Sequence, residues 1–360
     1  MVSNNGDRMT GENLNATPQQ PRGVHLIGSI PLENAEQVFR MTSSVLGGRL
    51  RRIPDGETGI RSDWIVWQIG FLARNPHFEA PSTNSVAYEA APKVRLRVPV
   101  ASSDITFDDL GYANAALTSY TVFSRLKHDG LIPARCRFQV SLPTPLAPVY
   151  AFVTPEDQAV VEPAYEAAMF AELDKISAAI PHNELAIQWD VALEFAIWEG
   201  VAPPDAPPQT RAGIIERLVR LGNRVPPGVE SGYHLCYGDL GHRHFKEPED
   251  TANLVEVANA VSAGVKRRIN WIHMPVPHNR TDEAYFAPLR NLKLQPGTEL
   301  YLGLVHFTDG VEGARKRIAA AQQVVADFGV ATECGFGRRP AETIPELLRI
   351  HSEVAAPVSA

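Results

Sequence analysis

Three side chains that favour a soft metal ion stand out in this sequence. His234 and Cys236 are separated by a single residue, and Cys334 lies in a distant Glu-Cys-Gly-Phe-Gly segment. Zinc is bound in proteins by three or four nitrogen and sulfur ligands that converge on one point. We therefore expect a zinc site if the fold brings the two segments together.

The His-x-Cys pair suits a β-strand, because side chains two positions apart on a strand point to the same face. Taken alone the pair is a weak signal, since a buried cysteine is commonly a small core residue. Cys334 strengthens it, because Gly335 and Gly337 let the chain turn sharply after it. The third cysteine, Cys136, falls near the start of another predicted strand and is expected to be structural.

A fourth ligand is less clear from the sequence. We favour His273, which falls at the end of a predicted strand. His278, Glu333 and a water molecule remain alternatives. We expect His242 and His244 in a loop that faces solvent, with a lid role as the alternative.

Composition excludes several classes of partner. The 360 residues carry a formal net charge of −7, and basic residues form no cluster beyond a local pair or triplet, which argues against a nucleic-acid surface. No run approaches the roughly 18 apolar residues of a membrane span, and the first residues lack the apolar core of a signal peptide. Three cysteines do not suggest a disulfide framework. We expect a cytoplasmic protein with reduced thiols and no nucleic-acid or membrane partner.

Apolar patterning indicates one large α/β domain. Residues 1–21 are polar and predict a disordered tail, and residues 22–360 form the domain. Eight short apolar runs predict strands at Val24–Ile30, Leu50–Pro54, Arg135–Leu142, Leu185–Ala192, Ser231–Tyr237, Arg268–Val276, Leu300–Phe307 and Val330–Cys334. Amphipathic stretches predict helices at Leu32–Val45, Ser62–Arg74, Tyr112–His128, Pro155–Ala179, Thr210–Leu221, Pro248–Ser262, Asp282–Leu289, Val311–Phe328 and Ala341–Val354.

Strands that are apolar on both faces and alternate with helices are typical of a parallel sheet covered on both sides. Eight such units predict a single (β/α)8 TIM barrel, in which residues 75–109 form an insertion between the second and third strands. A doubly wound open sheet is the alternative.

The barrel prediction also locates a site, because catalytic groups in TIM barrels lie where the strands end. Nearly every predicted strand ends in a polar or ligand-type residue. In chain order these are Gly28-Ser29, Asp55-Gly56-Glu57, Pro143-Thr144, Asp190 with Glu194, His234 with Cys236, His273, His306 and Cys334.

Six segments together resemble the C-terminal catalytic barrel of cobalamin-independent methionine synthase, in order and approximate spacing. They are Val24–Pro31, Asp55–Glu57, Ile187–Asp190, His234–Tyr237, Val305–His306 and Glu333–Gly335. The resemblance covers nearly the whole chain beyond the tail. It places the protein among short, single-barrel relatives in the superfamily of uroporphyrinogen decarboxylase and methionine synthase.

In that family a histidine, two cysteines and a glutamate hold a zinc ion that activates the thiol of homocysteine. The resemblance implies that His234, Cys236 and Cys334 are ligands, with His273 at the position of the glutamate. A neutral imidazole in place of a carboxylate would leave the metal more positive. Zinc would then hold a substrate thiolate more tightly and make it less nucleophilic.

The resemblance also implies a substrate site. Ser29, Glu57 and Asp190 match groups that hold the amino-acid end of homocysteine, and His306 matches a candidate proton-transfer histidine. Two carboxylates facing an ammonium group make a sensible clamp. The family's additional N-terminal barrel, which helps to bind folate, has no room in this chain, so the methyl donor stays open.

We therefore predict a zinc-dependent methyltransferase that uses a small-molecule thiol acceptor and a methyl donor, with homocysteine to methionine as the reference reaction. Opening of an epoxide by a thiol and demethylation of an aromatic ether are alternatives on the same scaffold. A non-catalytic zinc-binding or ligand-binding barrel is the alternative from another class. A metal-free decarboxylase is disfavoured by the cysteines. The sequence does not indicate an oligomeric state.

Overall fold

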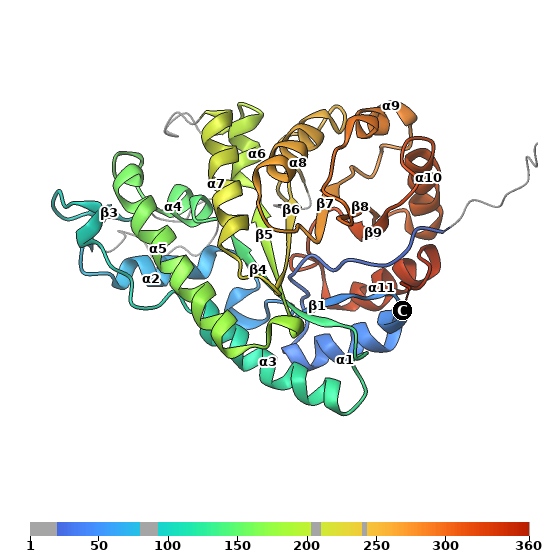
Figure 1. Cartoon of the computed structure of the whole chain (residues 1–360), viewed down its shortest axis with the longest axis horizontal. Coiled ribbons are helices and arrows are strands. Elements are labelled where there is room, and N and C mark those ends of the chain that lie inside the picture. The colour runs from blue at the N-terminus through green and yellow to red at the C-terminus, as the bar shows by residue number, and fades with distance from the viewer. Residues whose placement is uncertain (1–19, 80–92, 203–209, 240–242, 360) are drawn as a thin grey trace, which may run out of the picture.

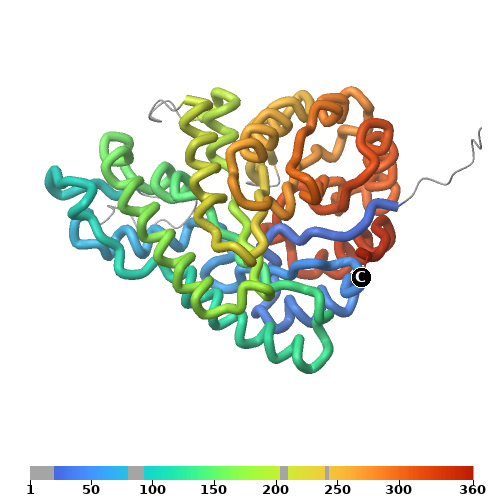
Figure 2. Tube along the Cα trace, in the orientation of Figure 1, coloured from blue at the N-terminus to red at the C-terminus, as the bar shows by residue number. Residues whose placement is uncertain are grey.

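A curled parallel sheet forms the centre of the computed structural model, which describes residues 20–79, 93–202, 210–239 and 243–359. The seven strands follow the order β1-β4-β5-β6-β7-β8-β9. Their bounds are Arg52–Pro54, Arg137–Pro143, Leu185–Val191, Glu230–Leu235, Trp271–Pro275, Glu299–Val305 and Gly329–Thr332. Helices lie around the outside of this sheet (Figures 1 and 2). The α/β class and the parallel order of these strands agree with the sequence-based prediction.

The helices mostly follow the predicted amphipathic stretches. They are α1 Ala35–Leu46, α2 Ile69–Arg74, α3 Tyr112–His128, α4 Leu146–Phe152, α5 Pro155–Ala179, α6 Leu193–Trp198, α7 Arg211–Arg224, α8 Ala252–Gly264, α9 Glu283–Phe286, α10 Gly310–Gln322 and α11 Ile344–Val354. Side-chain caps fix three of the starts: Asn34 accepts a hydrogen bond from the Gln37 N–H at α1, Thr210 accepts one from Gly213 at α7, and Asp282 accepts one from Tyr285 at α9. The short helices α4 and α6 were not predicted.

The first predicted strand is the main departure from an eight-stranded barrel. In the segment Val24–Ile30, Val24 forms single parallel bridges with Leu50 on one side and Val330 on the other. The Val24 N–H donates to the Arg49 carbonyl, and the His25 N–H donates to the Val330 carbonyl. The segment thus lies between β9 and the residues before β1, but it makes isolated bridges rather than a regular ladder.

The region predicted as an insertion holds a small separate sheet. Strands β2 (Phe78–Glu79) and β3 (Arg95–Leu96) pair antiparallel to each other and lie outside the seven-stranded sheet. Residues 80–92, between them, lie outside the described residues. Val94 bridges Val153 at the end of α4, so this part of the chain lies beside that helix.

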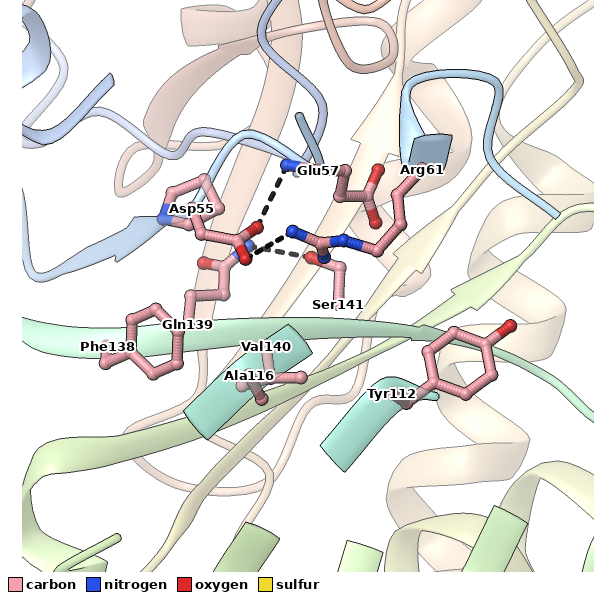
Figure 3. A pocket seen from close by; sticks show the side chains of 10 residues that line it. Asp55, Glu57, Arg61, Tyr112, Ala116, Phe138, Gln139, Val140 and Ser141 are labelled. Atoms are coloured by element: carbon pink, nitrogen blue, oxygen red, sulfur yellow. Dashed lines mark hydrogen bonds and ion pairs between the residues drawn. The ribbon is translucent and has the colours of Figure 1, made fainter. Parts of the chain in front are cut away.

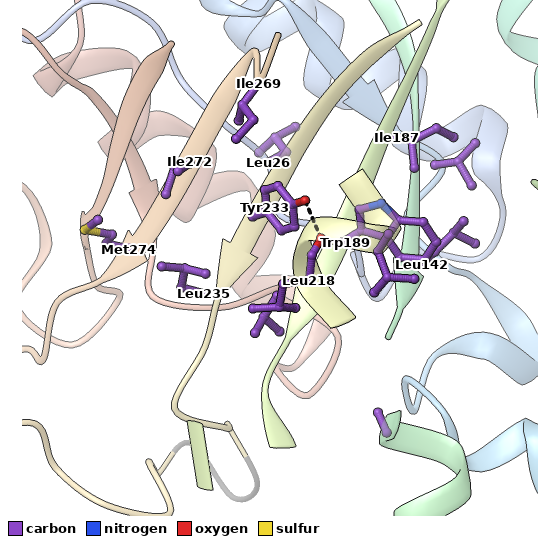
Figure 4. Packing of buried hydrophobic residues seen from close by; sticks show 14 of the residues in the cluster. Leu26, Leu142, Ile187, Trp189, Leu218, Tyr233, Leu235, Ile269, Ile272 and Met274 are labelled. Carbon is purple, nitrogen blue, oxygen red and sulfur yellow. Dashed lines mark hydrogen bonds between the residues drawn. The ribbon is translucent and has the colours of Figure 1, made fainter. Parts of the chain in front are cut away.

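Large apolar side chains fill the space between the sheet and its helices. Trp189 on β5 and Tyr233 on β6 are fully buried among Leu142, Leu235 and their neighbours (Figure 4). The Tyr233 hydroxyl donates to the Leu218 carbonyl on α7 at 2.8 Å, which satisfies its polar atom. Truncating such a buried aromatic costs about 3–5 kcal/mol. Strand alternation turns the next residues, including Asp190 and His234, to the opposite face of the sheet.

The predicted tail lies largely outside the described residues, which begin at Gln20. Pro21, expected in the tail, is buried, and its carbonyl accepts a hydrogen bond from the Ala356 N–H. The Gln20 side chain donates to the Glu353 carbonyl. Residues 20 and 21, which were predicted to belong to the tail, are therefore held by the C-terminal segment. Among the described helices, none combines the length and apolar character that a membrane crossing requires.

Candidate metal centre and its cavity

The fold brings His234, Cys236 and Cys334 together at the ends of β6 and β9. The Sγ atoms of the two cysteines lie 3.7 Å apart, and the Cys334 Sγ lies 3.7 Å from the His234 Nε2. All three candidate ligand atoms lie within 4.8 Å of one another. A tetrahedral zinc ion with bonds of about 2.3 Å to sulfur and 2.0–2.1 Å to nitrogen separates its ligand atoms by roughly 3.6–3.8 Å. The two spacings of 3.7 Å therefore fit a zinc ion, and the three side chains lie close enough for one ion to reach all of them after a small adjustment.

The protonation of these groups also suits a metal. His234 is 2% exposed, and burial, with His273 and His25 nearby, holds its pKa well below the ordinary value, so the imidazole is neutral. A hydrogen bond with Cys236, together with burial, holds the pKa of the Cys334 thiol well above its usual range. A bound zinc ion deprotonates a coordinating thiol outright. Two thiols and one neutral imidazole thus form a set of donor groups that suits zinc.

His273 lies behind His234 instead of beside the two thiols. Its Nε2 is 3.0 Å from the Thr332 carbonyl, and its Nδ1 is 2.8 Å from the Nδ1 of His234. A carbonyl only accepts hydrogen bonds, so the His273 Nε2 carries the proton, and its Nδ1 is an acceptor in the neutral ring. The Nδ1–H of His234 must then donate to His273, which leaves the His234 Nε2 with a free lone pair toward Cys334.

This arrangement differs from the predicted role of His273 as a fourth ligand. Both of its ring nitrogens are engaged, and it does not belong to the group of three. Burial lowers the pKa of His273 to about 3, so the ring stays neutral. The register of β6 and β7, which pairs His234 with His273, places the two rings side by side. His278, one of the alternatives, is exposed.

A pair of acids, of which Asp190 is buried and Glu57 is partly buried, lies in the cavity that His234, Cys236 and Cys334 also line. Glu57 has a φ of 49°, a strained value for a residue with a side chain. Asp55 holds it in place: its Oδ1 accepts the Glu57 N–H at 2.9 Å, and its Oδ2 accepts from Arg61 at 2.6 Å (Figure 3). Ser119 also donates to the Asp55 Oδ2, at 2.7 Å. This network holds the backbone of Glu57 in its left-handed conformation.

The second acid, Asp190, is held from the sheet. Gln188 donates to its Oδ1 at 2.8 Å. Burial raises the pKa of Asp190 to about 7, against hydrogen bonds from Gln188 and Trp64. Burial and the neighbouring Asp190 raise the pKa of Glu57 well above its usual range. Two such carboxyl groups together favour a cation, because a nearby positive charge lets both ionise.

Ser29 lies against the segment that follows Cys334. The Ser29 Oγ accepts the Gly337 N–H at 3.2 Å, and its carbonyl accepts the Phe336 N–H at 2.7 Å. A Cβ at Gly335 would clash with the Ser29 Oγ. The glycines after Cys334 are therefore needed because the two segments approach so closely, a reason that the sequence alone did not reveal.

One cavity of about 540 Å³ connects the metal group with the predicted substrate residues. Its wall includes Ser29, Glu57, Asp190, His234, Cys236 and Cys334. The unpredicted helices α4 and α6 add apolar side chains, namely Tyr150, Ala151, Leu193 and Ala196. Trp64, the other described non-glycine residue with positive φ (48°), also lines it. The cavity thus has a part that could hold a metal ion, an acidic part and an apolar wall.

Two histidines have contacts that the sequence did not predict. His306 is not among the residues that line the cavity, and its Nε2 donates to the Val276 carbonyl at 2.8 Å. His244, expected to face solvent, lines the cavity, and its side chain is only 4% exposed. His242 lies outside the described residues. Cys136 is buried and its thiol donates to the Leu50 carbonyl at 3.2 Å, which agrees with a structural role.

Comparison of the sequence with protein families and with curated proteins finds no match. Solved structures with a similar fold include a candidate vitamin-B12-independent methionine synthase from Listeria monocytogenes, with 15% identity over 94% of this chain and 99% of that one and a TM-score of 0.53. A B12-independent methionine synthase from Shewanella sp. W3-18-1, in complex with selenomethionine, is 14% identical over 93% and 96%, with a TM-score of 0.57. A methyltransferase from Methanosarcina mazei is 13% identical over 94% and 95%, with a TM-score of 0.53. At these identities the likeness establishes the shared fold.

Proposed function

We propose that this protein is a zinc-dependent methyltransferase that methylates a thiol, with homocysteine as the reference acceptor. The observation that carries the proposal is the opening of the His234, Cys236 and Cys334 group into the same cavity as the acid pair. Three protein ligands leave a fourth position on zinc for a substrate, as in catalytic zinc sites. The methionine synthase and methyltransferase named among the structural neighbours support this class of reaction.

Zinc bound by the three residues would supply a lowered thiol pKa, so that an acceptor thiol loses its proton near neutral pH. His273 would act as a positioning residue, because it holds His234 in the tautomer whose Nε2 faces Cys334. This positioning role replaces the role of fourth ligand, which the family resemblance implied for His273. The fourth position would then belong to the acceptor.

The acid pair favours an amino-acid acceptor over a simple alkyl thiol. An α-ammonium group placed between Glu57 and Asp190 would compensate two carboxylates that otherwise resist ionisation together. Ser29 lies beside Cys334 and would hold the carboxylate end of the acceptor. The acceptor thiol would then attack the methyl carbon of a donor packed on the apolar wall of α4 and α6, with one C–S bond formed as the donor's bond to that methyl breaks.

Epoxide thiolysis and aryl ether demethylation use the same cavity and differ only in the second substrate. A non-catalytic zinc-binding barrel would bind thiols without product. The acid pair concerns only the acceptor, so the second substrate that yields product distinguishes these reactions from one another. We expect a cytoplasmic protein, because all three cysteines are free in the structure.

The test compares two cysteines of the same chain. Elemental analysis of chelator-free protein should find one zinc per chain in wild type and in Cys136→Ala, and none in Cys236→Ala. Homocysteine and a panel of methyl donors should yield methionine, detected by mass spectrometry, from the two zinc-loaded proteins alone. A wild type without bound metal would refute the metal site, and a zinc-loaded wild type that makes no thioether from any donor would leave the binding-protein alternative.

A further inference from the structure

His244 projects from the segment after β6 into the cavity wall, between carboxylates from two parts of the chain. Its Nδ1 lies 3.1 Å from a Glu247 oxygen, within the same segment. Its Nε2 lies 3.3 Å from the Oε2 of Glu333, which follows β9. Although the side chain is only 4% exposed, His244 is one of the residues that line the cavity. Glu333 is not, so the histidine lies between this carboxylate and any ligand.

The Nε2 of His244 is buried and makes no hydrogen bond among the described residues. Glu333 is close enough for an ion pair, but the group is not aligned for a hydrogen bond with it. A buried donor left without an acceptor costs about 1–3 kcal/mol. A ligand that brings an acceptor to this wall of the cavity would remove that cost.

We propose that His244 donates a proton through Nε2 to the leaving group of the methyl donor, and that Glu333 is its positioning residue. The inference rests on the proposed methyl transfer. In the step, a C–S bond forms to the acceptor, and the bond between the methyl carbon and the donor heteroatom breaks. The electron pair left on that heteroatom takes the proton from His244, which then regains one from water.

The charges around His244 support this role. Burial lowers its pKa, but the carboxylates of Glu333 and Glu247 outweigh burial and raise the pKa to about 9, so the ring carries a proton at neutral pH. Asp239, another buried acid on the cavity wall, also faces this histidine. Glu333 raises the pKa of Asp239, whereas Arg338 and Arg339 lower it.

His306, the residue first expected to transfer the proton, is less suited. Its one N–H in the neutral ring donates to the Val276 carbonyl, and its Nδ1 faces Glu333 at 3.6 Å. Burial lowers its pKa to about 4, although Glu333 opposes the shift. In its neutral form His306 therefore has no proton to offer the cavity.

Donors with different leaving groups test the inference. Methyl transfer from trimethylsulfonium releases a neutral sulfide, which needs no proton. Transfer from 5-methyltetrahydrofolate releases an amine anion, and transfer from guaiacol releases a phenoxide-type anion, and both of these need a proton. His244→Gln should lower transfer from the donors that need a proton by about 10²-fold or more, the usual contribution of general acid catalysis. Transfer from trimethylsulfonium should change less than about threefold. His278→Gln, at an exposed histidine, is the matched control.

Two further measurements separate this role from a structural one. Zinc content and homocysteine affinity should be the same in wild type and His244→Gln. With the donors that need a proton, the rate should fall at alkaline pH as His244 loses its proton. Glu333→Gln removes a negative charge that raises the pKa of His244, so this fall should move to lower pH.

The other possible results contradict either the role of His244 or the proposed function. Equal losses with both kinds of donor, no loss with either, a donor-selective loss in His306→Asn instead, or a wild type that uses trimethylsulfonium alone would each overturn the role of His244. A zinc-loaded wild type that transfers no methyl group even from trimethylsulfonium would contradict the proposed function itself.

Discussion

The Nδ1 atoms of His234 and His273 lie 2.8 Å apart, and this contact decides which nitrogen of His234 is available to a metal. His273 donates its only N–H to the Thr332 carbonyl, so it can only accept from His234. The sequence offered both histidines as ligands, but they have different positions. His234 faces the thiols, and His273 orients His234. Groups that orient a ligating histidine commonly affect metal affinity nearly as much as the ligands.

Substitution of His273 should separate orientation from coordination. His273→Ala is expected to weaken zinc binding about 10- to 100-fold. His273→Asn, whose Oδ1 can accept from the His234 N–H, should recover most of the affinity. Competition with a chromophoric chelator measures both. Cobalt-substituted His273→Asn should keep the visible spectrum of wild type, and an altered spectrum together with failure of Asn to rescue would indicate that His273 is a ligand.

Asp190→Asn should weaken homocysteine binding by about 10- to 100-fold, since a hydrogen bond to a charged group contributes roughly 1.5–3 kcal/mol. Calorimetry against homocysteine and a plain alkyl thiol measures the effect, and Asp129→Asn, at an exposed aspartate, is the control. If wild type binds the two thiols equally, and Asp190→Asn changes neither affinity, the amino-acid clamp is refuted.

The same substitution should stabilise the fold in a pH-dependent way. The pKa of Asp190 rises on folding from 3.8 to about 7, so the folded state holds this proton more tightly than the unfolded state. The stability from this group is present below pH 4 and is lost as pH rises through 7. Asparagine has no such loss. Thermal unfolding should therefore favour Asp190→Asn by a few degrees at pH 8, and the difference should shrink toward pH 4; a constant difference would contradict the raised pKa.

Gly335→Ala tests the close approach of two segments at the site. A Cβ there would clash with the Ser29 side chain, so either Ser29 or Cys334 must shift. We expect weaker binding of both zinc and homocysteine. Gly70→Ala is the control, because its Cβ would meet nothing nearer than the Arg74 side chain at 3.7 Å. Unchanged affinities in Gly335→Ala would show that this contact is relaxed without effect on the site.

Ala196→Phe should fill the apolar wall on α6 and raise the KM for the methyl donor about tenfold or more, because space for it is lost. Homocysteine affinity and zinc content should stay unchanged. Ala179→Phe places the same side chain at an exposed position on α5 and serves as the control. A loss of homocysteine affinity with unchanged donor KM would assign this wall to the acceptor instead.

The sequence alone determined the candidate ligands and most of the framework that carries them. Residue chemistry identified His234, Cys236 and Cys334, and strand alternation placed the first two on one face. Apolar periodicity predicted α3 and α5 with their observed bounds and seven strands in their parallel order. These features depend on local spacing, which a sequence records directly.

Tertiary structure decided what each polar residue contacts. The register of β6 and β7 set His273 behind His234, and the tertiary fold brought His244 to Glu333, which lies 89 positions further along the chain. The first segment bridges its neighbours at single residues, and α4 and α6 are too short for helical periodicity to identify. Such contacts join residues far apart in the chain, and a change of one position in register would turn each side chain to the other face.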